Sequence, residues 1–188
     1  MRTHFFLLLL FLCGFTYAQQ EKEKENFDRL MPAMGALERG DYRQAIDSLR
    51  PLAADGTIEA QYALGTVLET APPPLRGLEA AYGWYLRAAE SGHAAAQNNL
   101  GAMHYDGRGA LRNFIEAARW YRLAAEHGHS LAMLELAQAL EIGLDIVADP
   151  AAAKMWRERA KTVAQQASRK GSDQPRGDQR VDPRRSRP

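Results

Sequence analysis

The stretch LGAMHYDGRGALRNFIEAARWYRLAAEHGH, which spans Leu100–His129, decides the fold because its features recur elsewhere in the chain. Glycines, alanines, leucines and tryptophans return at a constant step of 36 residues. Three recurring sets are Gly56, Gly92 and Gly128; Gly65 and Gly101; and Trp84, Trp120 and Trp156. A fixed period of this length is typical of repeat proteins, in which each repeat is one supersecondary unit.

Each unit is predicted to form two helices. In EAARWYRLAAEHG, residues 116–128, the larger apolar side chains recur at i, i+3, i+4 and i+7, which places them on one helix face. Asn113 is a candidate N-cap for this helix, and Gly128 can adopt the left-handed conformation that ends it. A partner helix is expected over AAAQNNLGAMHY, residues 94–105, followed by a tight turn at residues 106–109. No stretch alternates convincingly as a strand does, so the predicted fold class is all-α.

The repeated segment resembles the Sel1-like repeat, a helix–turn–helix unit related to the tetratricopeptide repeat. The residues that match the family pattern are Ala94, Ala96, Gln97, Leu100, Gly101, Gly107, Gly109, Ala117, Trp120, Tyr121, Ala124, Ala125 and Gly128. The resemblance extends over about Gly35–Lys161. It implies an α-solenoid of antiparallel helix pairs, wound into a right-handed superhelix like that of tetratricopeptide arrays, which binds other macromolecules.

The N-terminal residues 1–18 are predicted to be a cleaved signal peptide. Arg2 precedes the apolar run Phe5–Phe15, and small residues near the end of the segment favour cleavage after Ala18. The run is shorter than the roughly 20 apolar residues that a transmembrane helix needs, so no transmembrane span is expected. These features predict a periplasmic or secreted protein. Cys13 is the only cysteine, so the mature chain cannot form a disulfide within itself.

The mature chain is divided into three regions. Residues 19–34 are assigned to an N-terminal extension or cap, and residues 35–165 to the repeat domain, with about three full units plus capping halves. Residues 166–188 are predicted to be a disordered basic tail, because they are rich in Pro, Gly, Ser, Gln and Arg. The tail is either simply solvated or makes weak contact with an anionic surface. Nucleic acid is not expected as a partner of an exported protein.

The histidines do not form a recognisable metal or catalytic motif. His93 and His129 are repeat equivalents that each follow a glycine, and His127 is too close to His129 to share a helix face with it. The chain has no H-E-x-x-H motif, no Ser-x-x-Lys motif and no glycine-rich phosphate loop. We therefore predict no catalytic residue, no metal site and no cofactor.

Stacked helical hairpins form an extended concave surface that suits a protein or peptide partner. The candidates to line this surface are residues of the first helix of each unit that are mostly polar. They are Gln61, Tyr62, Gln97, Asn98, Asn99, His104, Met133 and Glu135. Amide side chains can hydrogen-bond to an extended segment. The alternative is that these side chains are merely solvated. His104 is interpreted as a core or groove histidine rather than a catalyst.

These features together predict a non-enzymatic, exported scaffold or adaptor that binds a protein or peptide in the cell envelope. Two alternatives stay open. One is an envelope or cell-wall enzyme, such as a β-lactamase-like hydrolase, and the other is a secreted host-interaction factor. Some exported, cysteine-rich relatives are linked to β-lactam or cell-wall chemistry, and the lack of cysteine in the mature chain is a departure from them.

Overall fold

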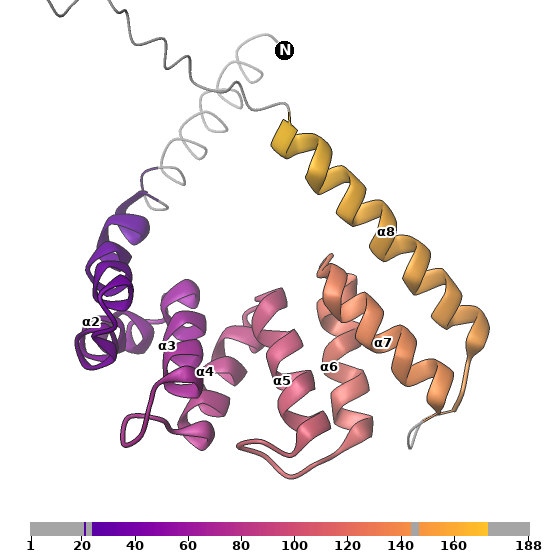
Figure 1. Cartoon of the computed structure of the whole chain (residues 1–188), viewed down its shortest axis with the longest axis horizontal. Coiled ribbons are helices and arrows are strands. Elements are labelled where there is room, and N and C mark those ends of the chain that lie inside the picture. The colour runs from indigo at the N-terminus through magenta and orange to yellow at the C-terminus, as the bar shows by residue number, and fades with distance from the viewer. Residues whose placement is uncertain (1–20, 22–23, 144–146, 173–188) are drawn as a thin grey trace, which may run out of the picture.

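The computed structural model describes residues 21, 24–143 and 147–172. All regular structure in these residues is helical, which confirms the predicted all-α class. The helices follow one another along an arc (Figure 1). The predicted signal peptide, residues 1–18, and residues 173–188 of the predicted tail lie outside the described residues.

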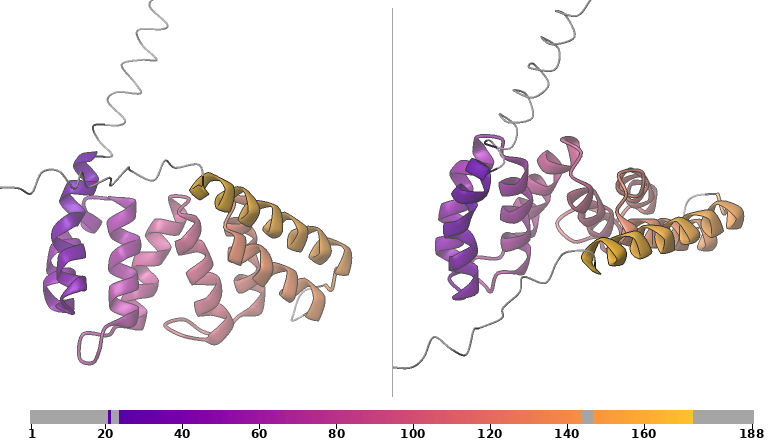
Figure 2. Two further views of the ribbon diagram at one scale, coloured as in Figure 1. Left: turned by 45° about the horizontal axis from the view of Figure 1, so that its top comes forward. Right: turned by 90° about the horizontal axis from the view of Figure 1, so that it is seen from above.

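The described helices form successive antiparallel pairs, and each packs against the next (Figure 2). Residues 24–38 form an N-terminal helix that pairs with the first labelled helix. The labelled helices are α2 (Tyr42–Ala54), α3 (Ile58–Thr70), α4 (Leu78–Glu90), α5 (Ala94–Asp106), α6 (Phe114–Glu126), α7 (Ser130–Ile142) and α8 (Pro150–Ser172). The repeated unit is therefore one hairpin: α3 with α4, α5 with α6, and α7 with α8.

The helix ends follow the expected capping chemistry. The Asn113 side chain accepts a hydrogen bond from the backbone N–H of Glu116 at 3.0 Å, as an N-cap residue should. Gly56, Gly92 and Gly128 follow α2, α4 and α6 with φ of 88°, 87° and 87°. This left-handed conformation is easily reached only by glycine, and it turns the chain directly into the next helix.

The core is a row of clusters rather than one centre. Buried side chains gather in three clusters, within residues 33–67, 81–120 and 117–160. Trp84 packs against the first cluster, Trp120 belongs to the second and Trp156 to the third. The three tryptophans thus occupy matching places in successive hairpins. Each hairpin buries its apolar face only against its neighbours, as in other solenoids.

Two region boundaries differ from the sequence prediction. The N-terminal helix runs through the boundary expected between residues 34 and 35, and it ends before Gly40, where φ is 73°. At the other end, α8 continues to Ser172, past residue 166, where the tail was expected to begin. Ala, Gln, Arg and Lys dominate residues 164–170, and these are good helix formers that extend an existing helix at little cost.

None of the described helices has both the length and the apolar character of a bilayer-spanning segment.

Candidate functional site

Four of the eight predicted binding residues lie in the interior. Gln61, Gln97 and Asn98 are 7%, 3% and 8% exposed, and Met133 is fully buried. Such side chains offer almost no surface to a partner, so the structure assigns them to packing between the hairpins. The other four candidates, Tyr62, Asn99, His104 and Glu135, are partly exposed.

The buried glutamines have a structural explanation. Gln61 Nε2 donates to the carbonyl of Ala53 at 3.1 Å, and Gln97 Nε2 donates to the carbonyl of Ala89 at 3.0 Å. Both carbonyls lie in the last turn of a helix, where backbone acceptors lack intrahelical partners. Each amide therefore joins the start of one hairpin to the end of the preceding one. Gln97 Oε1 also accepts from His127 Nδ1 at 2.8 Å.

Tyr62 and His104 are engaged with neighbouring aromatic residues. The Tyr62 ring stacks on the His93 ring with centroids 4.4 Å apart. The hydroxyl of Tyr82 lies 3.2 Å from His104 Nε2 and joins α4 to α5. The structure therefore places His104 at a contact between helices, where it is only partly exposed.

The repeated glycines leave space on one helix for tyrosine side chains of the next. A Cβ placed on Gly65 would lie 2.7 Å from ring atoms of Tyr85, and one on Gly101 would lie 2.6 Å from ring atoms of Tyr121. The sequence shows that these glycines recur, and the structure identifies the tyrosine rings as their neighbours. In the third hairpin the equivalents are Ala137 and Arg157, so the extra methyl group occurs where the ring is absent.

The Tyr85 hydroxyl reaches a polar cluster. It donates to Glu69 Oε2 at 2.8 Å and lies 3.2 Å from Thr66 Oγ1. Arg108, from the turn after α5, pairs with Glu69 at 2.6 Å and with Asp106 at 3.0 Å. Burial raises the pKa of Tyr85 above its ordinary value, and the carboxylate of Glu69 raises it further. The phenol thus stays protonated and acts as a hydrogen-bond donor.

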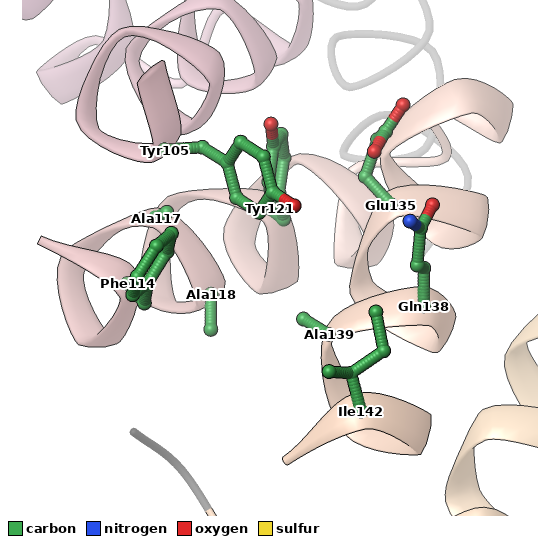
Figure 3. Close-up of a pocket in the computed structure, with 9 residues that line it drawn as sticks. All are labelled: Tyr105, Phe114, Ala117, Ala118, Tyr121, Glu135, Gln138, Ala139 and Ile142. Carbon is green, nitrogen blue, oxygen red and sulfur yellow. The ribbon is translucent and has the colours of Figure 1, made fainter. Parts of the chain in front are cut away.

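The Tyr121 hydroxyl lies instead at an apolar groove, which we call the α6–α7 groove (Figure 3). Its lining residues are Tyr105, Phe114, Ala117, Ala118, Tyr121, Glu135, Gln138, Ala139 and Ile142. Glu135 and Gln138 supply the polar groups beside the tyrosine, and the alanines form an apolar wall. Burial raises the pKa of Tyr121, and the nearby charge of Glu135 raises it further.

These two sites share one surface, which we call the tyrosine strip. We define the strip by two buried tyrosines, Tyr85 and Tyr121, and by the partly or fully exposed side chains around their hydroxyl ends, which are Thr66, Glu69, Asn99, Tyr105, Asp106, Arg108, Glu135 and Gln138. The two sites are linked by Arg108, which pairs with Glu69 of the polar cluster and with Asp106 at the end of α5. Of the predicted binding residues, the structure brings Asn99 and Glu135 onto this strip.

The remaining strip residues were missed by sequence reasoning. A comparison of equivalent positions in the three repeats could have found them. The positions at which the repeats carry different residues include the exposed ones. Among the described residues, no group of three or more His, Cys, Asp or Glu side chains could hold a metal ion. The strip can offer hydrogen bonds to a partner, and among its described carboxylates Glu135 has no ion pair, whereas Glu69 and Asp106 pair with Arg108.

Comparison with known proteins gives a consistent family. Residues 58–93, 94–129 and 130–161 match the family model described as Sel1 repeat, in register with the three hairpins. A solved Sel1 repeat protein from Oxalobacter formigenes is 30% identical with a TM-score of 0.66, covering 71% of this chain and 55% of that chain. No curated protein sequence matches.

A second solved structure is a protective antigen present in uropathogenic Escherichia coli strains, which displays an SLR fold. It is 29% identical with a TM-score of 0.68, covering 77% of this chain and 32% of that chain. The chain therefore spans about half of the first neighbour and about a third of the second.

Proposed function

Because the chain belongs to the Sel1 repeat family, whose members generally mediate protein–protein interactions, we propose that it is an exported, non-enzymatic scaffold. Its partner is a protein or peptide of the cell envelope, and its binding surface is the tyrosine strip. The proposal of export rests on the N-terminal sequence, with Arg2, the apolar run Phe5–Phe15 and a cleavage site after Ala18.

The observation that carries the proposal is the distribution of variation between the hairpins. Equivalent positions that repeat the same residue, such as Ala60, Ala96 and Ala132, are fully buried. The exposed equivalent positions on the strip differ, as Asn99 and Glu135 do, whereas the repeated Tyr85 and Tyr121 are buried. A constant backbone with a changing surface suits recognition of an extended partner, since successive units can each read a different part of it.

A capture experiment from periplasmic extract tests this function. The mature chain, residues 19–188, is crosslinked to its partners, in parallel with Tyr105→Ala/Glu135→Lys, which alters the strip. The matched control is Glu90→Lys/Glu126→Lys, which changes two exposed carboxylates that are repeat equivalents at the ends of α4 and α6. We expect one partner to be lost from the strip variant and kept by the control. Equal capture by all three proteins would refute the strip as the binding surface.

Export has its own test. The intact mass of the protein isolated from cells should correspond to a chain that begins at Gln19. A mass that retains residues 1–18 would contradict export through a cleaved signal peptide. Truncation after Ser172 tests whether the remaining basic residues contribute to binding, and any such contribution should vanish at high salt.

A secreted host-interaction factor is the second candidate. It is favoured by one observation, the similarity to a protective antigen present in uropathogenic Escherichia coli strains. The two candidates share the fold and the strip, so they differ in where the partner comes from. Capture from host-cell extract but not from periplasmic extract would favour the second. Hydrolysis of nitrocefin or muropeptides by the pure protein would favour the enzyme alternative over both.

A further inference from the structure

We propose that the α6–α7 groove binds a partner peptide in which an arginine or lysine lies next to a large apolar residue. The apolar side chain packs over the mouth of the groove, above Ala118 and Ala139 and against the exposed Ile142, and the cation pairs with Glu135. This inference deepens the proposed scaffold function and rests on it. The evidence comes from comparing this groove with its equivalent one hairpin earlier.

The chain fills the equivalent place in the preceding hairpin with its own side chains. The equivalents of Ala118 and Ala139 are Tyr82 and Met103. Tyr82 extends from α4 to α5, where its hydroxyl meets His104, and Met103 is fully buried. Replacing a tyrosine and a methionine by two alanines removes most of the side-chain volume on both walls. These two differences remove side chains that would otherwise occupy the α6–α7 groove.

The preceding hairpin also shows what binds beside the tyrosine hydroxyl. The turn after α5 comes close at Gly109, where a Cβ would lie 2.5 Å from the carbonyl oxygen of Leu78. This turn carries Arg108 to Glu69, the carboxylate that accepts from the Tyr85 hydroxyl. A guanidinium group therefore already lies beside one tyrosine–carboxylate pair of the strip. In the groove a tyrosine and a carboxylate again lie near each other, Tyr121 and Glu135, although Glu135 is the repeat equivalent of Asn99.

The charges indicate that Glu135 is the carboxylate available to a partner. Arg108 pairs with both Glu69 and Asp106, and Arg157 pairs with Glu141 at the end of α7. Within the described part of the chain, Glu135 forms no ion pair. A carboxylate beside an apolar wall is complementary to a basic side chain next to an apolar one, and a partly enclosed pair is less screened than an exposed one.

The occupant is a separate chain rather than the basic tail. The tail does contain the required pair, Arg180–Val181. However, the backbone of Asp149, next to the start of α8, bonds to Leu140 of α7 beside the groove. At about 1.5 Å per residue, the end of the 23-residue α8 lies roughly 34 Å from its start. A tail residue would have to return along most of that helix, so we assign the groove to a partner in trans.

Selection from a library of random dodecapeptides tests the assignment with the mature chain, residues 19–188. We expect enrichment of peptides that contain Arg or Lys beside Leu, Ile, Val or Met. For the enriched peptides, Glu135→Gln should weaken binding at least tenfold. Ala118→Tyr, which restores the residue of the preceding hairpin, should weaken it similarly. Glu126→Gln, an exposed carboxylate outside the groove, is the matched control and should leave affinity unchanged.

A charge exchange keeps the test valid if Ala118→Tyr fails to fold. Glu135→Lys should reject the basic peptide and bind its Arg→Glu version, since Glu135 is only partly buried and tolerates the change.

Enriched peptides without a basic residue, or binding that survives Glu135→Lys, would overturn the groove assignment while the scaffold function still stands. At least tenfold tighter peptide binding after truncation at Ser172 would overturn the assignment in trans, because it would show the tail to be the occupant. Failure to enrich any peptide would overturn the inference. If, in addition, the unaltered mature chain captured no partner from periplasmic extract, the scaffold function would be overturned.

Discussion

Replacing two helical glycines by alanine should have different effects on stability. Gly101 lies in α5 against the ring of Tyr121, whereas Gly83 lies on the exposed face of α4, where an added methyl group would have no atom within 4 Å. Alanine is favoured over glycine in a helix interior by about 1 kcal/mol at both sites. Gly83→Ala should therefore raise the melting temperature. Only Gly101→Ala adds a steric cost.

The cost at Gly101 follows from the distances. The new Cβ would lie 2.6 Å from two ring carbons of Tyr121 and 3.0 Å from a third, where ordinary contact begins at 3.4 Å. Tyr121 is only 4% exposed, so the ring has little free space into which it can move. Overpacking of this kind costs about 1–3 kcal/mol, which offsets or exceeds the helix gain. Gly101→Leu adds further atoms and should lie at the upper end of the range.

The measurement is the difference in melting temperature between the two alanine variants, followed by circular dichroism. At about 4 °C per kcal/mol for a domain of this size, an overpacking cost of about 1–3 kcal/mol separates them by about 4–12 °C. The double variant Gly101→Ala/Tyr121→Ala isolates the cause. Without the ring, Gly101→Ala should become stabilising, as it is at Gly83. Equal stabilisation by Gly101→Ala and Gly83→Ala in the wild-type background would refute the glycine–tyrosine packing.

Three further predictions follow from the packing and capping contacts. Trp120→Ala should destabilise by about 3–5 kcal/mol through cavity formation, and an unchanged melting temperature would contradict the stacked core. Gln97→Ala should cost about 1–3 kcal/mol in urea unfolding, because His127 loses its partner and the carbonyl of Ala89 keeps only its backbone donors. His93 and His129 cap α5 and α7 through Nδ1, and burial lowers the pKa of each below the ordinary 6.5. Just below pH 6.5 the unfolded chain therefore binds more protons than the folded chain. The free energy of unfolding should be highest above that pH and should fall as the pH decreases. The double variant His93→Asn/His129→Asn should flatten this dependence.

Much of the fold follows from local chemistry that the sequence displays. The 36-residue step sets the hairpins in register, and the glycines after α4 and α6 mark where each hairpin ends. Asn113 is recognisable as an N-cap because its side chain acts on a backbone group three residues away. These features depend on neighbours in sequence, so a single chain is enough to predict them.

The binding residues depend on neighbours in space, and the prediction was weaker there. A polar residue such as Gln97 is expected on a surface unless a buried acceptor lies within reach, and that acceptor belongs to the preceding hairpin. The first helix of each unit lies between other helices and buries more than one face, so its pattern does not separate interior from surface. The α6–α7 groove likewise comes from small residues on two different helices, Ala118 and Ala139.

The glycine–tyrosine pair links the fold to the surface that we propose for binding. A tyrosine on the second helix of a hairpin can reach the strip only if the first helix lacks a side chain at the crossing point, as at Gly65 and Gly101. Glycine has a lower helix propensity than other residues, but its missing side chain is what lets the tyrosine hydroxyl reach the strip. In the third hairpin Arg157 replaces the tyrosine and Ala137 replaces the glycine. The two positions change together because the methyl group and the ring compete for the same space.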